Sequence, residues 1–72
     1  MRPIKKDSVG FRIRMLRIHR DLTIRELAAL IGMRGPALGL VERNINDIST
    51  QRIIDICDVL QTSPNYLIWG EE

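Results

Sequence analysis

The arginines of this chain are the residues best suited to chemistry with a partner, and they are distributed unevenly. Residues 1–34 carry nine Lys and Arg against three Asp and Glu, a balance of +6. Residues 35–72 carry two against six, a balance of −4. Because a guanidinium fork matches phosphate oxygens, the basic half favours a nucleic-acid backbone as partner. A solvated helix face, or a patch that steers a protein partner, would show the same charges.

The other reactive side chains form no catalytic or metal-binding set. One Cys and one His can make neither a disulfide nor a zinc site. Cys57 falls on an apolar helical face, where a thiol is typically buried and inert. His19 falls in the last turn of a predicted helix, where a positive charge suits the helix dipole. We therefore expect no enzyme, no cofactor, no metal site and no small-molecule ligand.

Length and composition allow one small cytoplasmic domain. The chain has 72 residues, of which 44% are apolar and 28% charged, as in a soluble unit with a small core. Its longest apolar run, residues 27–33, is far short of the ~20 residues of a membrane helix, and residues 1–6 lack the apolar region of a signal peptide. We expect a flexible basic arm over residues 1–7, a helical domain over 8–70 and a tail over 71–72. The arm would track a phosphate backbone or enter a minor groove, or it would be a frayed tail.

Apolar residues at helical spacing, bounded by capping residues, predict five short helices and no strand. Thr23 and Glu26 form a capping box, and Gly32 and Gly70 suit left-handed C-caps. The predicted starts are Asp7 or Ser8, Thr23, Gly35-Pro36, Ser49 and Ser63-Pro64, and the predicted ends are Arg20, Gly32, Glu42, Leu60 and Gly70.

The second and third predicted helices, with the turn between them, form a helix-turn-helix candidate over about residues 23–42. Ala28 is small enough to let the two helices approach each other, and Gly32 makes the turn. Ile31, Leu38 and Val41 would bury the inner faces. Motifs of this kind typically place their second helix in the major groove of DNA.

Linked motifs extend this pattern over nearly the whole chain. They are Leu22-Thr23 before Glu26-Leu27-Ala28, then Gly32, Val41-Glu42-Arg43, Ser49, and Pro64-Asn65-Tyr66-Leu67 with Gly70. With these motifs, residues 9–70 resemble the Cro and phage-repressor family, the lambda-repressor-like or XRE-type helix-turn-helix proteins. The resemblance implies an all-α, five-helix lambda-repressor-like DNA-binding domain in a free-standing phage or prophage regulator.

The resemblance also implies roles for individual residues. Arg17 and Glu42 match positions that form a partly buried ion pair in relatives, and Tyr66 matches a core aromatic. In relatives the C-terminal helix helps to pair subunits, which implies a homodimer here. The residues expected at that interface are Pro64, Leu67 and Trp69.

The base-reading positions of the family hold residues without side-chain hydrogen-bonding groups. Relatives read bases with polar side chains at the start of the second helix and along the outer face of the third. The matching positions here are Ile24, Gly35, Pro36, Gly39 and Leu40. A good bidentate pair contributes ~1–3 kcal/mol of base discrimination, and none of these residues can form one. The scaffold therefore predicts DNA binding, whereas the reading face departs from the family.

Three hypotheses account for this departure. In the first, the protein is a sequence-specific repressor, and in the second it binds DNA weakly through phosphates alone. The residues assigned in the first are Ile24, Ala37 and Leu40 for thymine methyl groups, Arg34 or Arg43 for guanine, and Thr23, Arg25, Arg43 and Asn46 for phosphates.

In the third hypothesis the motif has become a protein-binding surface. An apolar strip would dock a partner repressor, and the protein would be an antirepressor or modulator. The strip consists of Ile24, Pro36, Leu38 and Leu40. An antitoxin is a lesser alternative.

Overall fold

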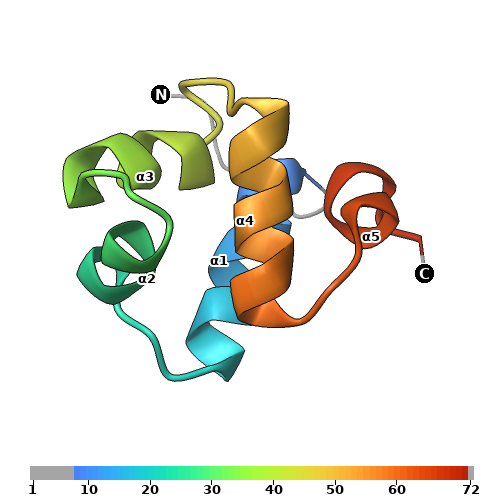
Figure 1. The fold of residues 1–72 in the computed structure, drawn as a ribbon. Helices are drawn as coiled ribbons and strands as arrows, with labels where there is room; N and C mark the ends of the chain where they lie inside the picture. Colours follow the sequence, from blue (N-terminus) through green and yellow to red (C-terminus); the bar gives the residue numbers. More distant parts are fainter. Residues whose placement is uncertain (1–7, 72) are drawn as a thin grey trace.

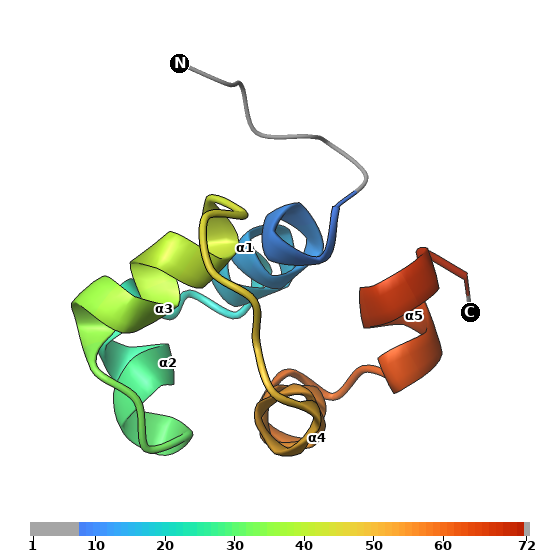
Figure 2. The same cartoon turned by 90° about the horizontal axis from the view of Figure 1, so that it is seen from above.

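The computed structural model describes residues 8–71, and this part of the chain forms five helices and no strand, as the sequence predicts. The helices are α1 (Val9–His19), α2 (Ile24–Leu30), α3 (Gly35–Glu42), α4 (Thr50–Leu60) and α5 (Pro64–Trp69). Helices α2 and α3 lie on one side of α1 and α4, and α5 lies on the other side (Figure 1, Figure 2). None of these helices has the length and apolar character needed to cross a membrane. The predicted arm, residues 1–7, and residue 72 of the predicted tail lie outside the described residues.

Hydroxyl caps start four of the five helices, at the predicted positions. The side chains of Ser8, Thr23, Ser49 and Ser63 each accept a hydrogen bond of 3.0–3.2 Å from the backbone N–H three residues later. At Thr23 the capping box is complete, because its backbone N–H donates to Glu26 Oε1 at 2.9 Å. The pKa of Glu26 lies below its ordinary value. The main cause is the hydrogen bond with the Thr23 backbone, and the Thr23 side chain adds a smaller effect. Helix α3 has no side-chain cap, but Pro36 lies in its first turn.

Every helix contributes to one apolar core. Six side chains have no exposed surface at all: Ile13, Leu27, Leu38, Ile56, Leu60 and Leu67. They come from all five helices, so detaching any one helix from the core would expose apolar surface to water. Ala28, Ile31 and Val41 complete the packing between α2 and α3, as the motif predicts.

Three arginines close the C-terminal ends of other helices. Arg12 donates to the carbonyls of Leu67 and Ile68 at 2.8 and 2.9 Å, and so ties α1 to the end of α5. Arg20 donates to the carbonyl of Leu60, the last residue of α4, at 2.7 Å. Arg52 donates to the carbonyl of Ile31, which caps α2. The last carbonyls of a helix lack intrahelical partners and carry partial negative charge, so guanidinium donors suit these positions. This repeated arrangement at three helix ends was not apparent from the sequence.

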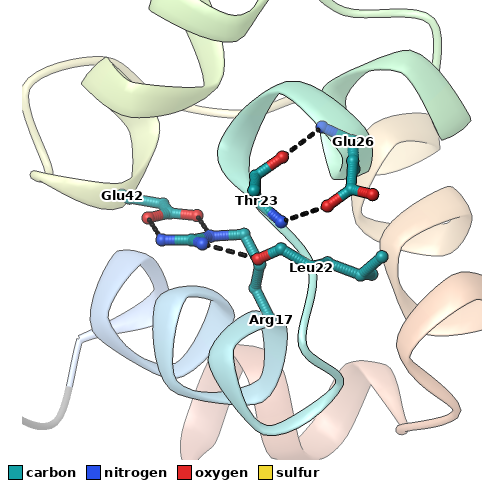
Figure 3. Close-up of polar contacts among 5 residues, drawn as sticks. All are labelled: Arg17, Leu22, Thr23, Glu26 and Glu42. Carbon is teal, nitrogen blue, oxygen red and sulfur yellow. Dashed lines mark hydrogen bonds and ion pairs between the residues drawn. The ribbon is translucent and has the colours of Figure 1, made fainter.

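Arg17 joins α1 to both helices of the motif (Figure 3). Its Nε donates to Glu42 Oε2 at 2.8 Å and its Nη2 donates to Glu42 Oε1 at 3.2 Å, a bidentate pair. Its Nη1 donates to the carbonyl of Leu22, just before α2, at 2.8 Å. Arg17 is 8% exposed and Glu42 is 2% exposed, so the pair is largely shielded from water. The resemblance paired these two residues, and they lie in contact here.

Gly10 brings α1 against the end of α3. A Cβ built on Gly10 would lie 2.4 Å from the Val41 carbonyl oxygen and 2.6 Å from that of Glu42. The Gly10 N–H donates to Asn44 Oδ1 at 3.3 Å, and Asn44 Nδ2 donates to Ser8 Oγ at 2.8 Å. Asn44 has a φ of 61°, a left-handed conformation that Asn tolerates better than most residues. The start of α1 is therefore connected to the end of α3 at a second point, apart from the contact of Arg17 with Glu42.

The buried ion pair predicts a large effect of Glu42→Ala on stability. Without Glu42 the guanidinium of Arg17 is left largely buried without its counter-charge, and the free energy of unfolding should fall by roughly 3–5 kcal/mol. Urea denaturation at neutral pH measures this decrease. The double variant Arg17→Met/Glu42→Leu should recover part of it, because no uncompensated charge remains. A decrease under about half a kcal/mol for Glu42→Ala would show that the pair does not hold the motif.

Two glycine-to-alanine substitutions should change stability in opposite directions. Gly10→Ala places a methyl group inside the backbone contact with α3 and should cost about 1–3 kcal/mol. A Cβ on Gly39, in the middle of α3, meets nothing within 4 Å, so Gly39→Ala should stabilise by up to ~1 kcal/mol through helix propensity. Thermal melting of both variants tests this. Equal effects of the two substitutions would contradict the close approach at Gly10.

Candidate nucleic-acid interface

The start of α2 presents a hydroxyl, an apolar side chain and a guanidinium side by side. Thr23 Oγ1 accepts from Glu26 N, and its own O–H can still donate to an oxygen of a partner. Ile24 is half-buried and packs partly against the core, whereas Arg25 is exposed. Thr23, Ile24 and Arg25 are therefore at least partly exposed at the N-terminus of α2. The helix dipole favours anions at a helix N-terminus.

The outer face of α3 is apolar and nearly bare. Pro36 is exposed, and Gly35, Ala37, Gly39 and Leu40 are half-buried. None of these side chains carries a hydrogen-bonding group, so the expected departure from polar base reading stands in the folded chain. The apolar strip needs one correction, because Leu38 is fully buried. It lies on the opposite face of α3 from Pro36 and Leu40, since helix geometry places residue 38 toward the core when 36 and 40 face outward.

The arginines divide into two groups. Arg12, Arg17, Arg20 and Arg52 are bound to carbonyls or to Glu42. The exposed arginines whose side chains enter no hydrogen bond or ion pair among residues 8–71 are Arg14, Arg25, Arg34 and Arg43. The basic half of the sequence is therefore a poorer guide to the phosphate surface than its charge suggests, because much of that charge serves the fold. Arg25, Arg34 and Arg43 are among the residues that the sequence assigns to DNA, whereas the sequence gives Arg14 no such role.

Asn46 lies in the loop between α3 and α4, beside an acidic residue. It is exposed and lines a surface hollow of about 480 Å³ together with Asp47, Asn44 and apolar residues that include Ile53 and Ile68. This hollow lies on the side of the molecule that holds the start of α1 and the end of α5. Asn46 therefore does not share a hollow with the other residues assigned to phosphates.

The C-terminal end presents one large exposed aromatic residue. Trp69 is 72% exposed and Pro64 is exposed, so both can reach a second chain. Leu67 is fully buried, and the expectation that it forms part of a subunit interface is wrong: its side chain points into the core of this chain. Tyr66 is only half-buried, beside Leu16 and Gln61 at a shallow hollow, rather than a core aromatic.

The groups capable of nucleophilic or metal chemistry are separated. Cys57 is buried, and burial, followed by the charge of Asp58, raises the pKa of its thiol. Within residues 8–71 no three His, Cys, Asp or Glu side chains lie together as metal ligands would. Asp55 accepts from Gln51 at 3.0 Å and lies 4.0 Å from Arg52, as on a solvated face.

Comparison with known proteins supports the helix-turn-helix fold. A family model described as helix-turn-helix matches residues 13–67. The chain is similar to the P22 c2 repressor in a complex with a synthetic operator, with a TM-score of 0.84 and 26% identity over 89% of this chain and 97% of that one. A comparison with curated protein sequences found no match.

Two further solved structures are similar over most of the chain. The restriction-modification controller protein C.AhdI from Aeromonas hydrophila has a TM-score of 0.79 and 31% identity over 86% of this chain and 94% of that one. The N-terminal DNA-binding domain of SinR from Bacillus subtilis has a TM-score of 0.78 and 29% identity over 89% and 91%. A SinR–SinI complex also matches, with a TM-score of 0.80 and 28% identity over 86% and 61%. By this match of family model, sequence and fold, the chain belongs to the helix-turn-helix family of Cro and phage-repressor type.

Proposed function

We propose that this protein is a phage or prophage transcriptional repressor of the Cro type that binds an operator in double-stranded DNA. The observation that carries the proposal is the position of Arg25, Arg34 and Arg43. All three are exposed and unpaired among the described residues, and they lie on the two helices of the motif or at their ends. Guanidinium groups in this arrangement can hold the backbone on either side of a groove that receives α3. Such a regulator works where the chromosome is, in the cytoplasm.

Base recognition would depend on apolar contacts and on one arginine. Ile24, Ala37 and Leu40 are the side chains available to contact thymine methyl groups, which distinguish A·T pairs in the major groove. Arg34 or Arg43 can form a bidentate contact with guanine. Gly39 adds no side chain to α3, and a Cβ there would meet nothing within 4 Å, so the backbone of α3 can approach a partner closely at this position.

Phosphate contacts would supply most of the affinity. Thr23 and Arg25 at the start of α2, Arg43 after α3 and Asn46 in the following loop are the proposed donors. If the apolar contacts add no discrimination, the protein binds DNA through these phosphates alone, which is the weaker form of the same function.

An antirepressor or modulator is the second candidate, and the apolar face of α3 favours it. Ile24, Pro36 and Leu40 could contact a partner repressor, and SinR has been solved in a complex with the protein SinI. The burial of Leu38 makes this strip smaller than the sequence suggested. We therefore place DNA before protein as the main partner, with an antitoxin role as a lesser alternative.

We also propose that the protein acts as a homodimer through Pro64 and Trp69. A Trp that is 72% exposed has much apolar surface to bury, and Trp is enriched at the energetic centres of interfaces. A dimer would present two motifs to two half-sites of an operator.

DNA titration tests the main proposal. Binding of the full chain is measured on a random-sequence duplex and on the region upstream of its own gene, each at about 50 and 200 mM salt. A repressor should prefer one sequence by ~10³-fold or more. Arg25→Gln and Arg43→Gln should each lower the salt slope by about 1, because each removes a phosphate contact.

The outcomes separate the candidates. Duplex binding without sequence preference would leave the phosphate-only form, and failure to bind any duplex at low salt would leave a protein partner. If a preferred site is found, replacing its thymines with uracil removes only the methyl groups. Unchanged affinity for the uracil site would contradict the proposed role of Ile24, Ala37 and Leu40.

The oligomeric state is a separate prediction. Sedimentation or gel filtration at tens of micromolar should give the mass of a dimer, and Trp69→Ala should shift it toward the monomer. Leu30→Ala is the matched control, because Leu30 is also largely exposed but lies on α2. A monomer mass for the unmodified chain would count against the dimer.

A further inference from the structure

Arg12 connects α1 to the last turn of α5 through a nearly buried guanidinium. Its Nε donates to the Leu67 carbonyl at 2.8 Å, and its Nη2 donates to the Ile68 carbonyl at 2.9 Å. Arg12 is only 8% exposed, so water competes little for these bonds. The planar fork of one guanidinium therefore holds two successive carbonyls at the point where α5 ends.

Gly70 lets this guanidinium lie against the end of α5. Its φ of 76° is the left-handed conformation that glycine adopts without strain, and its N–H donates to the Tyr66 carbonyl at 2.8 Å. A Cβ on Gly70 would lie 3.2 Å from Arg12 Nη1 and would crowd it. The end of α5 is therefore held both by its own cap and by Arg12 from α1.

Trp69 lies between these two points of attachment. It follows Ile68, whose carbonyl accepts from Arg12, and it precedes Gly70. Helix α5 has only six residues, and a helix of this length is not stable without tertiary contacts. The backbone that carries the exposed Trp69 side chain is therefore ordered by Leu67 in the core and by Arg12.

The same helix α1 also holds the motif, through a second arginine. Arg17 forms its bidentate pair with Glu42 at the end of α3. The motif and α5 lie on opposite sides of α1 and α4 (Figure 2). Because one helix binds both, the position of Trp69 relative to α3 is fixed within one chain. In a dimer this position determines how far apart the two motifs lie.

We propose that Arg12 is a positioning residue for self-association, because it holds the last turn of α5 and so presents Trp69 to a second copy of the chain. The inference rests on the proposed homodimer, which gives Arg12 no role. A segment that is already ordered in the free chain loses little conformational entropy on binding. Without Arg12 the last turn of α5 would have to become ordered when two chains associate, and the dimer would be weaker.

The dimer dissociation constant, measured by sedimentation equilibrium of the full chain, tests the proposal. Arg12→Met keeps an unbranched apolar stem but removes the donors, and it should raise the constant about tenfold. Arg12→Lys keeps the charge without the fork, so its constant should lie between the two. Arg20→Met is the matched control, because Arg20 also donates to the last carbonyl of a helix, that of Leu60 in α4. It should leave the constant unchanged.

Hydrogen exchange of the Gly70 amide measures the order of α5 separately from association. This amide is bonded to the Tyr66 carbonyl in the last turn, so its exchange reports the opening of that turn. In dilute protein it should exchange faster in Arg12→Met than in the unmodified chain, and Arg20→Met should not change it. Cooperative thermal melting shows that each variant is folded.

The outcomes distinguish this inference from the function on which it rests. If the unmodified chain is a dimer but Arg12→Met and Arg20→Met have the same dissociation constant, the role of Arg12 is wrong and the homodimer stands. If Arg12→Met weakens the dimer but Trp69→Ala does not, Arg12 does not act through Trp69, and the inference is again wrong. If the unmodified chain is a monomer at tens of micromolar, the homodimer fails and the inference fails with it.

Discussion

The buried contact of Arg17 with Glu42 is the interaction on which the functional surface depends. One guanidinium bridges the last residue of α3 and the carbonyl of Leu22, just before α2, and so fixes both helices of the motif against α1. Gly10 and Asn44 make a second junction between α1 and the end of α3. These contacts lie on the inner side of the motif. The side chains on the outer face of α3 take no part in them. Its composition can depart from that of relatives while the fold is kept.

The arginines show how one residue type serves two purposes in so small a chain. Those that reach the carbonyl ends of α2, α4 and α5 compensate the partial negative charge of those ends, and a core of this size is stabilised by such cross-links. The exposed arginines with unpaired side chains within residues 8–71 lie in α1 (Arg14), in α2 (Arg25) and at the two ends of α3 (Arg34 and Arg43). This division favours a surface whose affinity comes from phosphate contacts and whose selectivity must come from shape and apolar contact.

The sequence predicted the structural features that depend on residues close together in the chain, such as the helix caps. Ser8, Thr23, Ser49 and Ser63 start their helices through bonds to residues three positions away, and such local patterns can be read directly. The Arg17–Glu42 contact came from resemblance to a family. The bonds of Arg12 and Arg20 could not be predicted, because their acceptors are backbone carbonyls 55 and 40 residues away that leave no mark on side-chain type.

The sequence predicted most residues of the candidate site, but it did not predict which side chains face outward and which face the core. Leu38 and Leu40 are both apolar in a short helix, and only the packing of α3 decides that one enters the core while the other faces outward. For the same reason Leu67 was assigned to an interface although it fills the core. The exposure of Arg14 was not predicted, because nothing in its sequence context separates it from Arg12 and Arg17, whose side chains are buried.

The outer face of α3 and the start of α2 are the surfaces that we propose contact DNA. Amide chemical-shift mapping of the full chain, titrated with a short duplex at low salt, tests this claim most directly. We predict the largest changes at residues 23–25, along α3 and at Arg43, and little change at α5. Changes confined to α5 and the loop around Asn46, with α3 unaffected, would contradict it.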